Sequence, residues 1–161
     1  MATAIAISPA ERELLDYARS IGLPAEALDN FADGDYCPQK KQLIFHAACR
    51  EADHEDGPTQ VGFGGARGPG KSHGLFAQVA LDDCQRVGEL KCLYLRKIGK
   101  NAREQFEDLR RAVLRFTPHD FKTQAGTVHF PNGSRILIGH FNNESDIDNY
   151  LGLEYDLIAI E

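Results

Sequence analysis

The sequence predicts an α/β domain, a three-layer sandwich in which helices cover a mainly parallel sheet. Short apolar runs alternate with amphipathic helical patterns along the 161 residues, which is typical of this class. A glycine-rich stretch, residues 64–72, lies between an apolar run and a helical pattern, as at a strand–loop–helix turn. The pair Asn132-Gly133 between two apolar runs predicts one inserted β-hairpin.

The composition is that of one globular domain with a net charge of −6. No apolar run approaches the roughly 20 residues that span a bilayer. Residues 1–7 lack the basic start and the cleavage site of a signal peptide. The four cysteines form no C-x-x-C pair, so we expect neither a zinc knuckle nor a disulfide framework. We therefore expect a cytosolic protein with reduced, mostly buried cysteines.

Charge is unevenly distributed along the chain. Residues 86–115 hold nine basic and four acidic side chains, whereas residues 142–161 hold six acidic side chains and no basic one. The basic segment fits either a solvated helix face with ordinary strand ends or a surface that meets DNA phosphates. Charge alone favours the first interpretation. The candidates for DNA contact are Arg96, Lys97, Lys100 and Arg103.

Residues 1–36 are predicted to form a helical segment ahead of the main domain, residues 37–161. The first helix begins at Ser8 with a capping-box sequence. A second short helix is expected at residues 24–30, and a third begins at Pro38. The sequence leaves open whether the first two helices form an accessory arm or belong to the main domain.

The other elements of the main domain follow from hydrophobic periodicity and length. Strands are expected at residues 61–64, 92–95, 127–130, 135–138 and 155–160, and helices after residue 72 and from residue 102. In the hairpin, Asn132-Gly133 can take the positive φ angles that a type I′ turn demands. Pro131 beside this turn suggests an edge position in the sheet.

The segment from Gly65 to Ser72 matches the pattern G-x-x-x-x-G-K-[ST], the phosphate-binding loop of nucleoside triphosphatases. Glycines let backbone N–H groups approach a polyphosphate closely. Lys71 then reaches the β- and γ-phosphates, and the Ser72 hydroxyl ligates Mg²⁺. The loop residues predicted to bind ATP are Gly65, Ala66, Arg67, Gly68, Pro69, Gly70, Lys71 and Ser72.

Three residues carry more specific hypotheses. Arg67 either contacts the γ-phosphate or points outward and pairs with an acid. The amide of Gln42 can form two hydrogen bonds to an adenine edge, although its spacing alone favours an ordinary surface glutamine. Glu161 follows four apolar residues, at the place where an acid holds the Mg²⁺ water shell beside Lys71 and Ser72. The predicted catalytic residues are Lys71, Arg67 and Glu161, and the predicted metal site combines Ser72 with Glu161.

Together these motifs resemble the ATPase domain of the large terminase subunit of tailed bacteriophages, the motor that packages DNA into a capsid. The resemblance covers residues 36–161. The matching pieces are Pro38-x-x-x-Gln42 with Phe45-His46, residues 64–72, Leu93-Tyr94-Leu95-Arg96-Lys97, Phe130-Pro131-Asn132-Gly133-Ser134, and Gly152-Leu153-Glu154-Tyr155-Asp156-Leu157-Ile158. The phosphate loop marks only the superfamily, whereas the hairpin motif followed by Gly-x-Glu-Tyr-Asp is far more specific.

The resemblance implies a RecA-like P-loop fold of the ASCE type, with ATP and Mg²⁺ as cofactors. It implies hydrolysis that drives double-stranded DNA into a procapsid, in the cytoplasm of a bacterial host. The implied partners are the terminase small subunit, the portal protein and further copies in a ring. It also supports Gln42 as an adenine reader and Arg67 as the loop arginine used in hydrolysis. Glu161 stands where the family usually has an aspartate.

In this family a second acid follows the metal-site acid and activates the attacking water. We therefore expect an N-terminal part of a longer protein, without the coupling segment and the nuclease domain, that by itself hydrolyses ATP negligibly. Two other functions are compatible with the residues. One is a helicase-like P-loop ATPase, and the other is a nucleotide-binding fragment that acts in assembly without hydrolysis.

Overall fold

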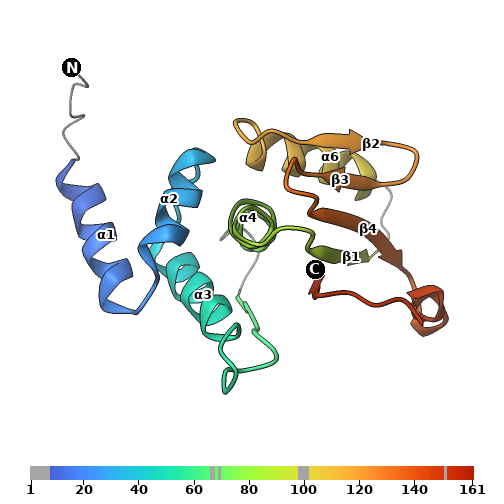
Figure 1. Cartoon of the computed structure of the whole chain (residues 1–161), viewed down its shortest axis with the longest axis horizontal. Coiled ribbons are helices and arrows are strands. Elements are labelled where there is room, and N and C mark those ends of the chain that lie inside the picture. The colour runs from blue at the N-terminus through green and yellow to red at the C-terminus, as the bar shows by residue number, and fades with distance from the viewer. Residues whose placement is uncertain (1–7, 66–67, 69, 98–101, 151) are drawn as a thin grey trace.

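A computed structural model describes residues 8–65, 68, 70–97, 102–150 and 152–161. These residues form an α/β fold with a five-stranded mixed sheet. Helix α4 (Lys71–Ala77) lies in the middle of the molecule, between three N-terminal helices and the sheet (Figure 1). None of the helices in these ranges has the length and apolar character needed to span a bilayer.

The N-terminal helices are α1 (Pro9–Ser20), α2 (Ala25–Asp33) and α3 (Lys40–Glu51). The predicted capping box of α1 is confirmed. The Ser8 hydroxyl accepts a hydrogen bond from the Glu11 N–H at 3.2 Å, and the Glu11 carboxylate accepts one from the Ser8 N–H at 2.8 Å. These bonds satisfy backbone donors that have no partner within the helix.

Helices α1 and α2 pack against the rest of the chain. Ala27 and Phe31 of α2 belong to the same buried apolar cluster as Phe76 of α4. Gly34, which follows α2, lies so close to Leu81 that a Cβ atom would come within 2.7 Å of its Cδ2. The core is therefore continuous from the first helices to the helix that follows the glycine-rich loop.

One continuous helical run follows the glycine-rich loop, as the sequence predicts. It consists of α4, a π-helical segment η1 (Gln78–Asp83) and α5 (Cys84–Arg86). Its apolar face is buried, and so are the polar side chains of Gln78, Asp82 and Asp83 in the π segment. Such π segments are rare and occur frequently at functional sites.

The sheet has the strand order β2-β3-β4-β1-β5. Its strands are β1 (Lys91–Lys97), β2 (Asp120–Lys122), β3 (Thr127–His129), β4 (Arg135–Phe141) and β5 (Leu157–Ile160). Strand β1 is parallel to both β4 and β5, whereas β3 is antiparallel to both β2 and β4. The sheet is therefore mixed, and the prediction of a mainly parallel sheet is correct only for β4-β1-β5. The sequence did not predict β2, which is three residues long.

The helices cover one face of this sheet. Tyr94 of β1 packs edge-to-face against Phe76 of α4, and Phe76 packs in the same way against Phe106 of α6 (Ala102–Val113). On the opposite face, Ile158 and Ile160 of β5 are 56% and 64% exposed. The expected three layers are therefore seen only in part among the described residues, because no helix covers these two isoleucines.

The predicted hairpin is present as β3 and β4, but its turn is not type I′. Gly133 has φ 88°, whereas Asn132 is not among the residues with positive φ. The Gly133 N–H donates to the Phe130 carbonyl at 3.1 Å, and the Phe130 N–H donates to the Ser134 carbonyl at 2.9 Å. This is a type I turn with Pro131 at its second position, closed by a glycine bulge. The proline fixes a negative φ, which favours this turn over the mirror-image type.

The hairpin turn is bonded to the end of the central helical run. The Asn132 amide donates to the Cys84 carbonyl at 2.7 Å, and the Ser134 hydroxyl donates to the Val87 carbonyl at 2.6 Å. These carbonyls lie at a helix C-terminus, where backbone acceptors lack partners within the helix. The Phe130-Pro131-Asn132-Gly133-Ser134 motif therefore joins the sheet to the helix that begins at the glycine-rich loop.

The strand predicted at residues 61–64 is wrong, since residues 61–65 form no strand. Two of the four positions, Gly62 and Gly64, are glycines, which weaken strand formation. Phe63 instead stacks on Phe45 of α3 with ring centroids 4.8 Å apart. The four cysteines are free. Cys84 and Cys92 are buried, Cys49 is partly buried and Cys37 is exposed, so the expectation of mostly buried cysteines holds for two of the four.

Candidate functional site

The glycine-rich loop has the backbone that its glycines permit. Gly65, Gly68 and Gly70 have φ angles of 139°, 99° and 69°, in the region where a Cβ atom causes strain. Gly70 immediately precedes α4. Within this loop, the residues that lie outside the described ranges are Ala66, Arg67 and Pro69. The roles predicted for those three, including both alternatives for the arginine, stay predictions.

Lys71, the first residue of α4, extends over the loop. Its ammonium group donates a hydrogen bond to the Gly65 carbonyl at 2.9 Å. The side chain is partly exposed. A lysine ammonium has three donors, and it therefore has the capacity to contact a phosphate oxygen beside this loop.

The sheet places Glu161 next to the start of α4. Strand β5 is in register with β1, with Ile160 opposite Leu95, and the Glu161 N–H donates to the Leu95 carbonyl at 2.9 Å. Because side chains alternate between faces, Glu161 points to the same face as Ala159. That face carries Tyr94, which packs against α4. The carboxylate thus lies at the carboxyl ends of two parallel strands, where ligands bind in open α/β sheets.

Ser72 and Glu161 are in direct contact although 89 positions separate them in the chain. The Ser72 hydroxyl donates a short hydrogen bond to Glu161 Oε1. Both groups offer oxygen ligands, which Mg²⁺ prefers. The described residues contain no group of three or more His, Cys, Asp or Glu that could hold a metal ion. Whether this pair holds Mg²⁺ together with substrate phosphates stays a prediction.

Two further side chains of β1 bind the same carboxylate. The Tyr94 hydroxyl donates to Glu161 Oε2 at 2.9 Å, and Arg96 forms an ion pair with this oxygen at 3.0 Å. Burial, followed by the charge of Glu161, raises the pKa of Tyr94 far above its usual range. The phenol is therefore protonated at neutral pH and acts as a donor. Neither residue was predicted to contact Glu161, because only the register of β1 and β5 reveals this.

Gln42 lies beside the loop but is buried. Its amide donates to the Gly70 carbonyl at 3.0 Å and accepts from the Gln39 N–H at 2.8 Å. Only 5% of the residue is exposed. The structure therefore places Gln42, the predicted adenine reader, at the loop. Both the nitrogen and the oxygen of its side-chain amide form hydrogen bonds with backbone groups. Whether it also contacts a base stays a prediction.

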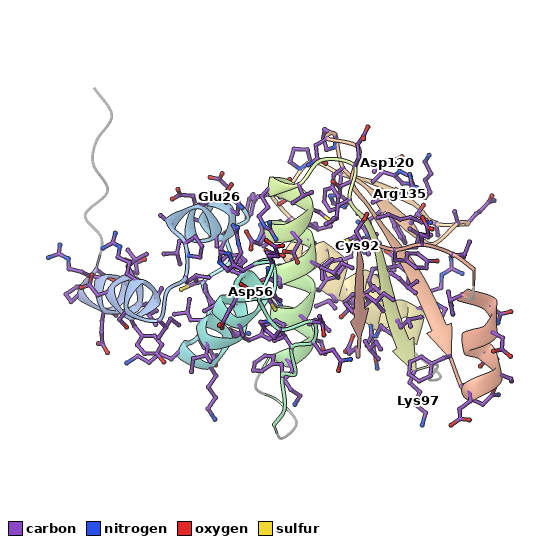
Figure 2. The ribbon with its side chains drawn as sticks, turned by 60° about the horizontal axis from the view of Figure 1, so that its bottom comes forward. Glu26, Asp56, Cys92, Lys97, Asp120 and Arg135 are labelled. Atoms are coloured by element: carbon purple, nitrogen blue, oxygen red, sulfur yellow. The ribbon has the colours of Figure 1, made fainter. Side chains whose placement is uncertain are left out.

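The four candidates for DNA contact are in different surroundings. Arg96 is only 13% exposed in its side chain and is paired with Glu161. Lys97 and Arg103 are exposed, and Arg103 donates to the Thr123 carbonyl at 3.5 Å. Figure 2 shows Lys97 at the end of the sheet toward which β1 and β4 run. Lys100 lies outside the described residues. The burial of Arg96 favours a role at Glu161 over contact with a DNA phosphate.

A buried polar network behind the loop was missed by the sequence analysis. His46 of α3 lies with Nδ1 2.8 Å from Gln78 Oε1 and Nε2 3.1 Å from the Tyr36 hydroxyl. The Gln78 amide nitrogen donates to Asp82 and to Asp83, so its oxygen accepts from His46 Nδ1. Burial lowers the pKa of His46 to about 4, so the ring is neutral at pH 7.

The same network continues into ion pairs that join three helices. Arg50 of α3 donates to both carboxylate oxygens of Asp82, at 2.7 and 2.8 Å, and to Glu26 of α2 at 3.0 Å. Arg86 pairs with Asp83 at 2.8 Å. Figure 2 shows Glu26 on the side of the central helix away from the sheet. No sequence pattern signals these partners, because consecutive aspartates are typical of an exposed surface, whereas both are buried in the π segment.

The structure therefore gathers Lys71, Ser72, Gln42 and Glu161 around one loop at the carboxyl ends of parallel strands. The described groups at this place are an ammonium group, a hydroxyl and a carboxylate, which are chemically able to contact phosphate and a hard cation. Comparisons of the chain with models of protein families, with curated proteins and with solved structures find no match.

Proposed function

We propose that the chain binds ATP with Mg²⁺ and is the nucleotide-binding part of a DNA-packaging motor of the terminase large-subunit type, with a RecA-like P-loop fold. The hydrogen bond between Ser72 and Glu161 carries this proposal. In P-loop nucleoside triphosphatases, the hydroxyl after the loop lysine and an acid at a strand end hold Mg²⁺. Here, residues 89 positions apart supply that pair of groups next to a glycine loop.

Each residue has a defined task in this proposal. Lys71 contacts the β- and γ-phosphates, and the Ser72 and Glu161 oxygens hold the cation, which when bound neutralises phosphate charge. The backbone N–H groups between Gly65 and Ser72 surround the phosphate chain. Gln42 fixes the end of the loop through Gly70. Arg67 is proposed as the loop arginine of the same site.

The motor assignment rests on the more specific motifs. Within residues 130–134, the hydrogen bonds of Asn132 and Ser134 join the hairpin to the end of the helical run that begins at the loop. Double-stranded DNA, the terminase small subunit, the portal protein and a ring of copies are the proposed partners. Lys97 and Arg103, both exposed, are the described residues proposed to contact DNA phosphates.

The central test is nucleotide binding by the Lys71→Ala variant. With a fluorescent ATP analogue and Mg²⁺, we expect the variant to bind at least about tenfold more weakly, because a charge-assisted contact is lost. Lys41→Ala, which removes an exposed lysine from α3, is the matched control and should bind like wild type. Circular dichroism confirms that both variants are folded. Equal affinity of Lys71→Ala and wild type would show that the loop does not bind the phosphates.

A further inference from the structure

Both oxygens of the Glu161 carboxylate contact neighbouring side chains. Oε1 accepts from the Ser72 hydroxyl and from Arg96 Nη2 at 3.3 Å. Oε2 accepts from the Tyr94 hydroxyl at 2.9 Å and pairs with Arg96 Nε at 3.0 Å. Arg96 supplies the only positive charge among these partners.

Arg96 is held in this position by the sheet. It lies one residue beyond Leu95, the last β1 residue in register with β5, and its side chain is 13% exposed. Its Nη1 atom is buried and has no hydrogen-bond partner within the described part of the chain. A buried donor without a partner is costly. Because Nη1 gains nothing there, the contacts of Nε and Nη2 with Glu161 hold the guanidinium in place.

We propose that Arg96 is a positioning residue that fixes the Glu161 carboxylate and cancels its charge, so that phosphates can enter the loop without a divalent cation. This inference rests on the proposed function of the loop as a phosphate site. Glu161 is in contact with Ser72, next to Lys71, so an uncompensated carboxylate there would repel a polyphosphate. Mg²⁺ would cancel the same charge when bound, and Arg96 does so with a group that is always protonated.

The inference predicts how strongly nucleotide binding depends on Mg²⁺. In the Arg96→Gln variant, the affinity for a fluorescent ATP analogue in EDTA should fall about five- to tenfold, a typical coupling between neighbouring sites. In saturating Mg²⁺ its affinity should match wild type within about twofold. Arg135→Gln is the matched control, because this exposed arginine begins β4 at the opposite end of the sheet from Lys97 (Figure 2). The control should change neither value.

A double variant separates charge cancellation from simple structural support. Arg96→Gln combined with Glu161→Gln should recover the wild-type affinity in EDTA, because neither charge remains. An equal loss of affinity with and without Mg²⁺ in Arg96→Gln would overturn the inference, since support of the fold alone would lower both values. Thermal unfolding of each variant confirms that the comparison is made between folded proteins.

Failure of the proposed function gives a different result. If Glu161→Gln binds the analogue with the same Mg²⁺ dependence as wild type, Glu161 is not part of a metal site, whatever Arg96 does. If Glu161→Gln reduces the Mg²⁺ dependence and Arg96→Gln behaves as wild type in EDTA, the metal site stands and the role assigned to Arg96 is wrong.

Discussion

The side-chain amide of Gln42 donates a hydrogen bond of 3.0 Å to the carbonyl oxygen of Gly70, the last residue before α4. Its oxygen accepts from the Gln39 N–H at the start of α3. One buried amide thus joins the beginning of one helix to the end of the phosphate loop. This gives Gln42 a task that does not involve a nucleotide base.

The Gln42→Ala variant separates loop support from base recognition. We expect it to bind both ATP and inorganic tripolyphosphate several-fold more weakly, because the Gly70 carbonyl keeps only the Gly74 N–H as a donor and the loop loses its link to α3. Competition against a fluorescent ATP analogue measures both ligands. If the affinity for ATP falls while the affinity for tripolyphosphate is unchanged, Gln42 contacts the adenine instead.

The Gly70→Ala variant tests the backbone of the loop. Gly70 has φ 69°, and a Cβ atom there would lie 2.9 Å from the Gln42 amide nitrogen. We expect a loss of about 1–3 kcal/mol in the free energy of unfolding, measured in urea. Gly62→Ala is the control, since no atom beyond its chain neighbours lies within 4 Å of the added methyl group. A Gly70→Ala protein as stable as Gly62→Ala would contradict the left-handed backbone described at this position.

The buried His46 predicts a pH dependence of stability. Burial lowers its pKa to about 4, whereas an unfolded histidine has a pKa of about 6.5. The unfolded chain therefore takes up the proton first on acidification. The stability that neutral His46 contributes is complete above about pH 6.5 and is lost as the pH falls toward 4. Burial also raises the pKa of Asp83 to about 6, so protonation of this acid favours the folded state over much of the same range.

Because these two groups oppose each other, the measurement compares variants rather than wild type alone. The difference in unfolding free energy between wild type and His46→Gln should shrink by about 2 kcal/mol between pH 7 and pH 5. His54→Gln, an exposed histidine, should show no such change. If the difference in unfolding free energy between wild type and His46→Gln stays constant between pH 7 and pH 5, His46 does not take up a proton when the chain unfolds in this range.

The exposed cations Lys97, the last residue of β1, and Arg103 of α6 predict weak, sequence-independent DNA binding. Replacing both Lys97 and Arg103 with alanine should weaken binding of a DNA duplex and reduce the slope of log K against log salt, by about 0.9 for each lost phosphate contact. Fluorescence anisotropy at several salt concentrations measures this slope. Lys41→Ala on α3 is the control. An unchanged slope in the double variant would show that Lys97 and Arg103 do not contact DNA phosphates.

Local signals in the sequence were sufficient for the features that depend on a few neighbouring residues. The capping box at Ser8, the glycines of the loop and the amphipathic helices were predicted because their hydrogen bonds and φ angles involve positions within one or two turns. The hairpin at Asn132-Gly133 was predicted for the same reason. Its turn type was not, because the φ restriction of Pro131 outweighs the preference of the Asn-Gly pair.

Tertiary structure alone decided the partners of Glu161 and Gln42. The sequence indicated an acid at a strand end, but the register of β5 beside β1 placed Tyr94 and Arg96 on its carboxylate. That register depends on packing across tens of residues, which periodicity does not encode. Gln42 became a buried support of Gly70 for the same reason. The sequence by itself determined which chemical groups are available, and the packing of helix on sheet determined which of them meet.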